Sequence, residues 1–158
     1  MVLGSEAELQ VRAGGDPHLN LRDLALGYLK QAQVRIADAS NAQLAGNHAY
    51  ALRLSQECVE FCVKASLRSV AIEYPKVHEV SGLLQEFQHR FPPWFRDEVV
   101  FIQSTSVSLF KKRELAFYGG EDTALPPDKV ISAEDGKNAV QSAEKVFSLA
   151  KRLLAKSK

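Results

Sequence analysis

The chain has 158 residues, of which 46% are hydrophobic and 25% charged, and its formal net charge is +1. This length and composition predict one folded domain with its own core. The balanced charge excludes a strong overall attraction to nucleic acid or anionic membrane, although a local patch remains compatible with either. No apolar run approaches the roughly 18 residues of a membrane-spanning helix, and the N-terminus does not resemble a signal peptide, so we expect a cytoplasmic protein.

Turn and helix signals divide the chain into a flexible N-terminal extension, residues 1–19, and a helical domain, residues 20–158. Apolar residues recur at steps of three or four, and no convincing strand appears. Helices are expected at about 20–43, 48–73, 75–89 and 94–117 and from Ser132 onward, where Asp135 predicts a capping box. The predicted fold class is all-α, an up-and-down bundle of about five helices.

The second helix is apolar nearly all round, which is typical of the central helix of a bundle. It keeps one polar stripe, formed by Arg53, Glu57, Glu60, Lys64 and Arg68. Arg53 with Glu57 and Glu60 with Lys64 are spaced for ion pairs that contribute about 0.2–0.5 kcal/mol each.

Two cysteines, Cys58 and Cys62, lie one turn apart on this helix. No further cysteine or neighbouring histidine completes a zinc ligand set. We therefore expect buried free thiols, no metal and no cofactor.

The fourth helix carries a charge on its inward-facing stripe. This stripe comprises Phe95, Val99, Ile102, Ser106, Leu109, Arg113 and Ala116. Burying a lone guanidinium is costly, so Arg113 needs a carboxylate, a dimer interface or an anionic ligand. The candidate carboxylates are Glu57, Glu60, Glu114, Glu121 and Asp122. The alternative is a position near the helix end, where the cation favours the helix dipole and reaches solvent.

Two further features adjoin this position. The small residues of 103–108 predict that another helix, of this chain or of a second copy, approaches closely. Tyr118, Gly119 and Gly120 follow Arg113 and form a weak candidate for a phosphate site.

His78 follows Pro75 at the expected start of the third helix. We expect it to bond a free backbone amide there or to pack as a lid. Acid–base chemistry would require a partner, and the sequence names none uniquely.

Three stretches resemble the HEPN family, the nucleotide-binding domain of higher eukaryotes and prokaryotes. "AYALRLSQECVEFCVKASLRSV" resembles its second helix, with Gln56, Glu57 or Glu60, and Lys64-Ala65 at the family positions. "YPKVHEVSGLLQEF" resembles its Pro-x-x-His segment, and "KKRELAFYGG" with "ISAEDGKNAVQSAEKVFSLAKRLL" resembles its closing section. The resemblance covers about residues 20–156.

This resemblance implies an up-and-down bundle that dimerises, a role in RNA biology, toxin–antitoxin pairs or defence, and in several members a small nucleotidyltransferase partner. Ribonuclease members carry an arginine that a histidine follows after four to six residues. Arg113 matches that arginine, but no histidine follows it anywhere in the chain. Tyr118 is a poor substitute, because an ordinary tyrosine stays protonated at neutral pH.

The leading hypothesis is a non-catalytic protein that binds nucleotide or RNA through Arg113, Tyr118, Gly119 and Gly120. Glu57, Lys64 and His78 are possible supporting residues. It would act as a homodimer or with a nucleotidyltransferase. The alternatives are a metal-independent ribonuclease, in which Arg113 works with Tyr118 or His78, and a structural dimeric adaptor without a nucleotide ligand.

Overall fold

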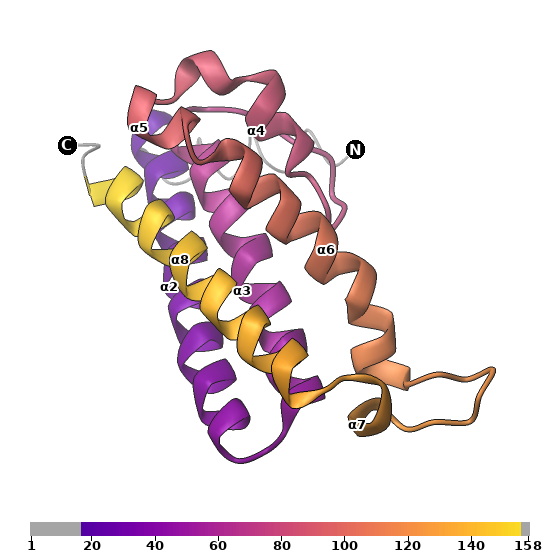
Figure 1. The fold of residues 1–158 in the computed structure, drawn as a ribbon. Coiled ribbons are helices and arrows are strands. Elements are labelled where there is room, and N and C mark those ends of the chain that lie inside the picture. The colour runs from indigo at the N-terminus through magenta and orange to yellow at the C-terminus, as the bar shows by residue number, and fades with distance from the viewer. Residues whose placement is uncertain (1–16, 156–158) are drawn as a thin grey trace.

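Four long helices make up most of the fold in the computed structural model, which describes residues 17–155. These helices are α2 (Pro17–Leu44), α3 (His48–Ser69), α6 (Val99–Tyr118) and α8 (Ala133–Ala155). They alternate in direction, and α3 packs against the other three (Figure 1). The predicted all-α up-and-down bundle is confirmed. Of the predicted extension, residues 1–16 lie outside the described part, and residues 17–19 belong to α2.

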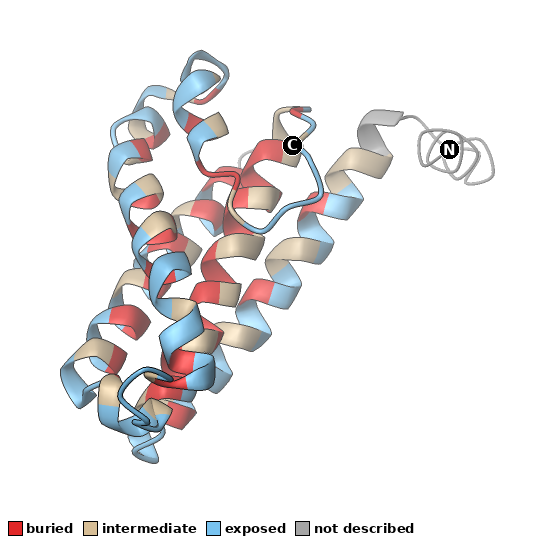
Figure 2. Ribbon diagram, turned by 90° about the vertical axis from the view of Figure 1, so that its right-hand side faces the viewer, coloured by how far each residue is buried: buried red, intermediate tan, exposed pale blue. Residues whose placement is uncertain are grey.

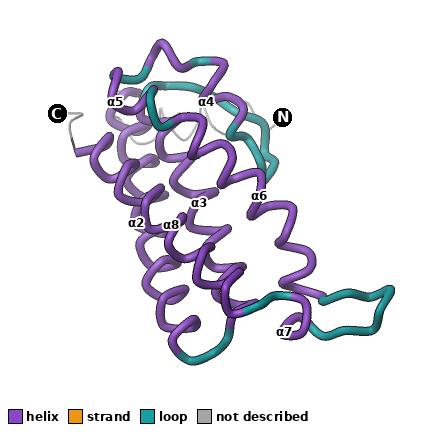
Figure 3. The backbone as a smooth tube through the Cα atoms, viewed as in Figure 1, coloured by secondary structure: helices purple, strands orange, loops and turns teal. Residues whose placement is uncertain are grey.

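Short helices fill the connection between α3 and α6 and the one before α8. They are α4 (Gly82–Glu86), the 3-10 helix η1 (Gln88–Arg90), α5 (Pro93–Arg96) and α7 (Pro127–Val130). Figure 3 shows helices joined by loops, and the described residues contain no strand. None of the helices in this part is long and apolar enough to cross a lipid bilayer.

The helix that the sequence predicted at about 75–89 is absent over the first half of that range. α3 ends at Ser69, because Ala71 takes a left-handed conformation with φ 60°. Pro75 then lacks an amide donor and keeps the residue before it out of helical conformation. Helical structure resumes only at Gly82, so His78 lies in a loop. Its expected bond to a helix N-terminal amide is therefore also wrong.

The core is centred on α3, whose buried residues lie on most of its sides (Figure 2). Leu52, Val59 and Leu67 of α3 are almost fully buried. Burial of each such side chain contributes about 1.5–3 kcal/mol. Cys58 and Cys62 are buried and free, as expected, and burial raises the pKa of the Cys62 thiol.

The start of α8 is fixed by a reciprocal cap between Ser132 and Asp135. The Ser132 amide donates to Asp135 Oδ2 at 3.0 Å, and the Asp135 amide donates to Ser132 Oγ at 3.0 Å. The amide of Ser132 holds the pKa of Asp135 below its usual value, with smaller contributions from the Ser132 hydroxyl and Lys112. The predicted capping box is confirmed.

Candidate functional site

The polar stripe of α3 lies between α2 on one side and α6 on the other. Glu57 pairs with Arg35 of α2 at 3.2 Å. The guanidinium of Arg53 lies 3.9 Å from the ring centre of Phe117 in α6. The expected pair of Arg53 with Glu57 is thus replaced by contacts with the two neighbouring helices.

Glu60 is the centre of a polar network in the middle of this stripe. Its carboxylate accepts from Lys64 Nζ at 3.0 Å and from Gln56 Nε2 at 3.2 Å. The predicted pair of Glu60 and Lys64 is confirmed, with side chains only 16% and 15% exposed. A carboxylate this far from water requires such partners, so the network stabilises the buried charge.

His78 joins this network from the loop after α3. Its Nδ1 lies 3.2 Å from each carboxylate oxygen of Glu60. A carboxylate only accepts hydrogen bonds, so Nδ1 carries the proton. The imidazole also lies beside Phe110 of α6, with ring centres 6.4 Å apart. The structure therefore brings two predicted supporting residues, Lys64 and His78, together at Glu60, whereas Glu57 pairs elsewhere.

Arg113 is partly buried in the C-terminal half of α6, three positions after Phe110 and four positions before Phe117. These three residues lie three and four positions apart and therefore share one side of the helix. Within residues 17–155, no hydrogen bond or ion pair reaches the guanidinium of Arg113. The carboxylates of Glu57 and Glu60 are already paired.

The dipole of α6 does not explain this cation either. Arg113 precedes the last turn of the helix, and helix dipole effects are confined to that turn. The roles that stay open for Arg113 are exposure of its guanidinium to solvent, contact with an anionic ligand and contact with a second chain.

Tyr118, Gly119 and Gly120 line a different pocket, of about 480 Å³, at the end of α6. Its rim carries Glu114, Glu121 and Asp122, whereas Arg113 does not line it. The structure thus separates Arg113 from the residues that were expected to bind phosphate with it. Three carboxylates also make this pocket unfavourable for an anion.

The two glycines have a structural role in the hairpin that follows α6. Gly119 has φ 76° and ψ −166°, and a Cβ there would collide with the backbone of Leu125 and Pro126. Gly120 and Leu125 exchange two backbone hydrogen bonds of 2.9 and 3.0 Å. The space beside Gly119 is therefore filled by the chain itself, and the expected contact of both glycines with a ligand stays a prediction.

A search of protein families matches residues 25–153 to the HEPN domain. The chain belongs to the HEPN family. A search of solved structures finds the crystal structure of an archaeal HEPN homologue, with a TM-score of 0.62 and 24% sequence identity. That match covers 82% of this chain and 97% of the homologue, and at this identity it shows the shared fold alone. A search of curated proteins gives no match.

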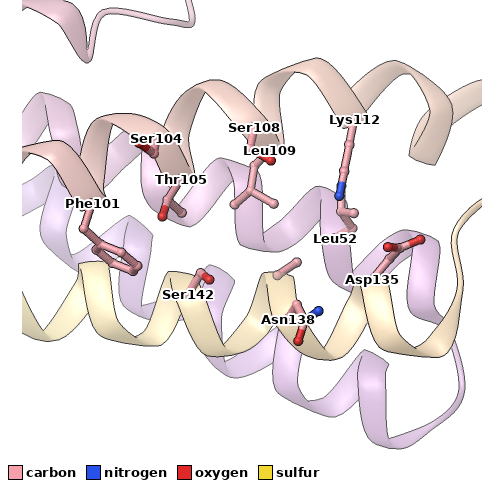
Figure 4. Close-up of a pocket in the computed structure, with 11 residues that line it drawn as sticks. Leu52, Phe101, Ser104, Thr105, Ser108, Leu109, Lys112, Asp135, Asn138 and Ser142 are labelled. Atoms are coloured by element: carbon pink, nitrogen blue, oxygen red, sulfur yellow. The ribbon is translucent and has the colours of Figure 1, made fainter.

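This HEPN domain has a groove between α6 and α8 that the sequence did not predict. The groove has a volume of about 300 Å³, with Leu52 at its floor and Ser104, Ser108 and Ser142 on its walls (Figure 4). The small residues of 103–108 had predicted close approach of another helix. Thr105 and Ser106 of this stretch are buried, whereas Ser104 and Ser108 line the groove, and approach of a helix from a second copy stays a prediction.

Proposed function

We propose that this HEPN protein binds RNA or a nucleotide without cleaving it, at a surface formed by Phe110, Arg113 and Phe117 of α6 and Arg53 of α3. We call this the Arg113 surface. The observation that carries the proposal is Arg113 itself, a partly buried guanidinium with no acceptor among the described residues. A phosphate would supply that acceptor through two parallel hydrogen bonds.

Aromatic residues on the same side of α6 as Arg113 support the choice of a nucleic acid. Phe110 is 38% and Phe117 44% exposed, which is unusual for phenyl rings. Tyr118 is still more exposed and its ring lies 4.7 Å from that of Phe117. Bases stack on such rings with about 1–3 kcal/mol each, independently of sequence. Arg53, above Phe117, adds a second cation at the same place.

The absence of a histidine after Arg113 supports binding over cleavage. The ribonuclease members that the sequence resembles pair the arginine with such a histidine, and none follows Arg113 in this sequence.

The test is fluorescence anisotropy with a labelled single-stranded RNA oligonucleotide and the Arg113→Ala variant. We expect affinity to fall about 10–100-fold, because a hydrogen bond to a charged group contributes about 1.5–3 kcal/mol. Lys111→Gln is the matched control, since it also removes one positive charge but from an exposed position on another side of α6. Unchanged RNA binding by a folded Arg113→Ala protein would refute the proposal.

We also propose that the protein acts as a homodimer or as the partner of a small nucleotidyltransferase. In support, Leu115, Phe117 and Tyr118 expose large apolar side chains close together at the end of α6. Neighbouring exposed apolar residues of this kind mark interaction surfaces. Light scattering should give the mass of two chains, and Phe117→Glu should halve it. A wild-type monomer would leave only the partner protein as the explanation.

A metal-independent ribonuclease is the second candidate, and the position of His78 favours it. The His78 ring lies against Phe110, which precedes Arg113 by three residues on the same side of α6. Glu60 orients the imidazole in the way that a carboxylate orients a catalytic histidine. Labelled RNA incubated with the protein decides between the candidates. Cleavage that both Arg113→Ala and His78→Ala abolish would establish the enzyme, and intact RNA would dismiss it.

A further inference from the structure

Residues 73–78 lie between α3 and α4 and have no regular structure. All of them except Tyr74 are exposed. Within residues 17–155, the only backbone hydrogen bond of this segment runs from the Val77 amide to the Pro75 carbonyl and therefore stays inside it. The segment is thus held against the described part of the bundle by side chains alone.

Both ends of the segment are fixed. On one side, Ile72 is buried, and its amide donates to the Leu67 carbonyl at 3.0 Å. On the other side, Glu79 accepts from the Ser106 hydroxyl of α6 at 2.8 Å. Residues 73–78 are therefore a short span between two anchored positions. Loops that open and close over a site have this arrangement, with the backbone rotation confined to a few residues at each end.

Tyr74 and His78 hold the middle of the span. The Tyr74 ring lies against Arg68 of α3, whose guanidinium carbon is 4.6 Å from the ring centre. His78 Nδ1 donates to the carboxylate of Glu60 at 3.2 Å. The His78 side chain is 60% exposed, so water competes for this contact and keeps it weak.

A cavity of about 760 Å³ lies between this span, α2 and the C-terminal half of α3. Two donors at the cavity, Arg68 Nε and the Tyr74 hydroxyl, are buried and have no hydrogen-bond partner within residues 17–155. Burying a donor without an acceptor costs free energy, which is recovered when the donor returns to water. The two donors therefore oppose the position that the span takes in the structure.

We propose that residues 73–78 form a lid that opens and closes over this cavity, with the contact between His78 and Glu60 as its latch. The structure shows the closed lid. When the lid opens, the Tyr74 hydroxyl and Arg68 Nε gain water as hydrogen-bond partner, and the cavity opens to solutes on this side.

The lid also connects the cavity with α6. In the closed position the His78 ring lies beside Phe110 of the Arg113 surface, with ring centres 6.4 Å apart. Opening takes the imidazole away from that surface. This consequence rests on the proposed function, whereas the opening of the lid does not depend on RNA binding.

The test is proteolysis of the folded, full-length chain at low trypsin concentration. Lys76 lies in the lid, and trypsin must bind an extended stretch around it, so the rate of cleavage there follows the population of the open lid. Lys30, inside helix α2, is the internal reference, because cleavage there requires unfolding of the helix. We expect cleavage at Lys76 well before Lys30. Equal rates at the two sites would overturn the proposal.

His78→Ala removes the latch and should raise the rate at Lys76 about two- to fivefold, with the rate at Lys30 unchanged. Each rate is divided by that of a synthetic peptide with the same change, which corrects for the sequence preference of trypsin. His89→Ala is the matched control, since His89 is also exposed beside a phenyl ring but lies outside the lid. An unchanged rate at Lys76, or an equal rise at Lys30, would exclude the latch.

Tyr74→Phe tests the driving force for opening, because it removes the hydroxyl and keeps the ring. The closed lid then no longer buries this donor, so cleavage at Lys76 should become about fivefold slower. A tyrosine whose hydroxyl stabilised the closed position would give faster cleavage instead. Tyr50→Phe, at an exposed tyrosine of α3, is the control. Cleavage of Tyr74→Phe at the wild-type rate or faster would overturn the proposal.

Discussion

Glu60 and Arg113 are both partly buried charges in long helices of one bundle, but their surroundings differ. Glu60 accepts hydrogen bonds from Gln56, Lys64 and His78. The guanidinium of Arg113 has no such partner in the described part of the chain. The described part of the bundle compensates the charge at Glu60 but provides no acceptor for the guanidinium of Arg113. The first position should therefore matter for stability and the second for binding.

The largest effect is expected from Glu60→Ala. The change leaves Lys64 and Gln56 without their acceptor at a site with little water, so the free energy of unfolding should fall by about 2–4 kcal/mol. Urea denaturation measures this loss. Glu57→Ala is the matched control, since its pair with Arg35 is more exposed and should contribute less than about 1 kcal/mol. Equal losses in the two variants would contradict the central role of Glu60.

Gly119→Ala should have the next largest effect and tests the hairpin that follows α6. The φ of 76° and ψ of −166° at this residue are accessible to glycine alone, and the new Cβ would collide with Leu125. We expect a loss of about 1–3 kcal/mol in thermal unfolding. Gly27→Ala is the control, because nothing lies within 4 Å of the new Cβ and alanine favours helix α2. It should leave stability unchanged or raise it by up to about 1 kcal/mol.

Asp135→Ala should have a smaller effect that depends on pH. Its carboxylate caps α8 with Ser132, and losing a cap costs about 0.5–1 kcal/mol at neutral pH. The pKa of Asp135 is lowered in the folded protein, so its contribution is present above the unfolded pKa and disappears as the pH falls through the lowered value. Melting curves of the variant and the wild type should therefore converge in acid. A difference that stays constant down to pH values below both pKa values would rule out this carboxylate as the cause.

The sequence predicts features that depend on neighbouring residues and fails where distant segments meet. The long helices and the pairing of Ser132 with Asp135 follow from spacings of three or four residues, and both are present. His78 and Glu60 are 18 positions apart, and only the path of the irregular segment after α3 joins them.

Arg53 shows the same limit within a helix. Its spacing predicted an ion pair with Glu57, but it stacks on Phe117 of α6. Contact with an aromatic ring of another helix leaves no periodic signal in α3. The HEPN resemblance pointed to Arg113, but only the fold shows that Tyr118, Gly119 and Gly120 line a pocket that Arg113 does not line.

Arg113→Gln should have the smallest effect on stability. It therefore tests most directly whether Arg113, unlike Glu60, matters for binding and not for folding. The guanidinium has no partner to lose in the described chain, so the free energy of unfolding should change by less than about 0.5 kcal/mol. Arg35→Gln is the control, because that arginine does lose hydrogen bonds to Glu57 and Gln31. Urea denaturation and RNA binding are measured on the same preparations. Intact stability with weakened RNA binding separates the function of Arg113 from folding, whereas a loss of stability above that of Arg35→Gln would show that Arg113 is part of the fold.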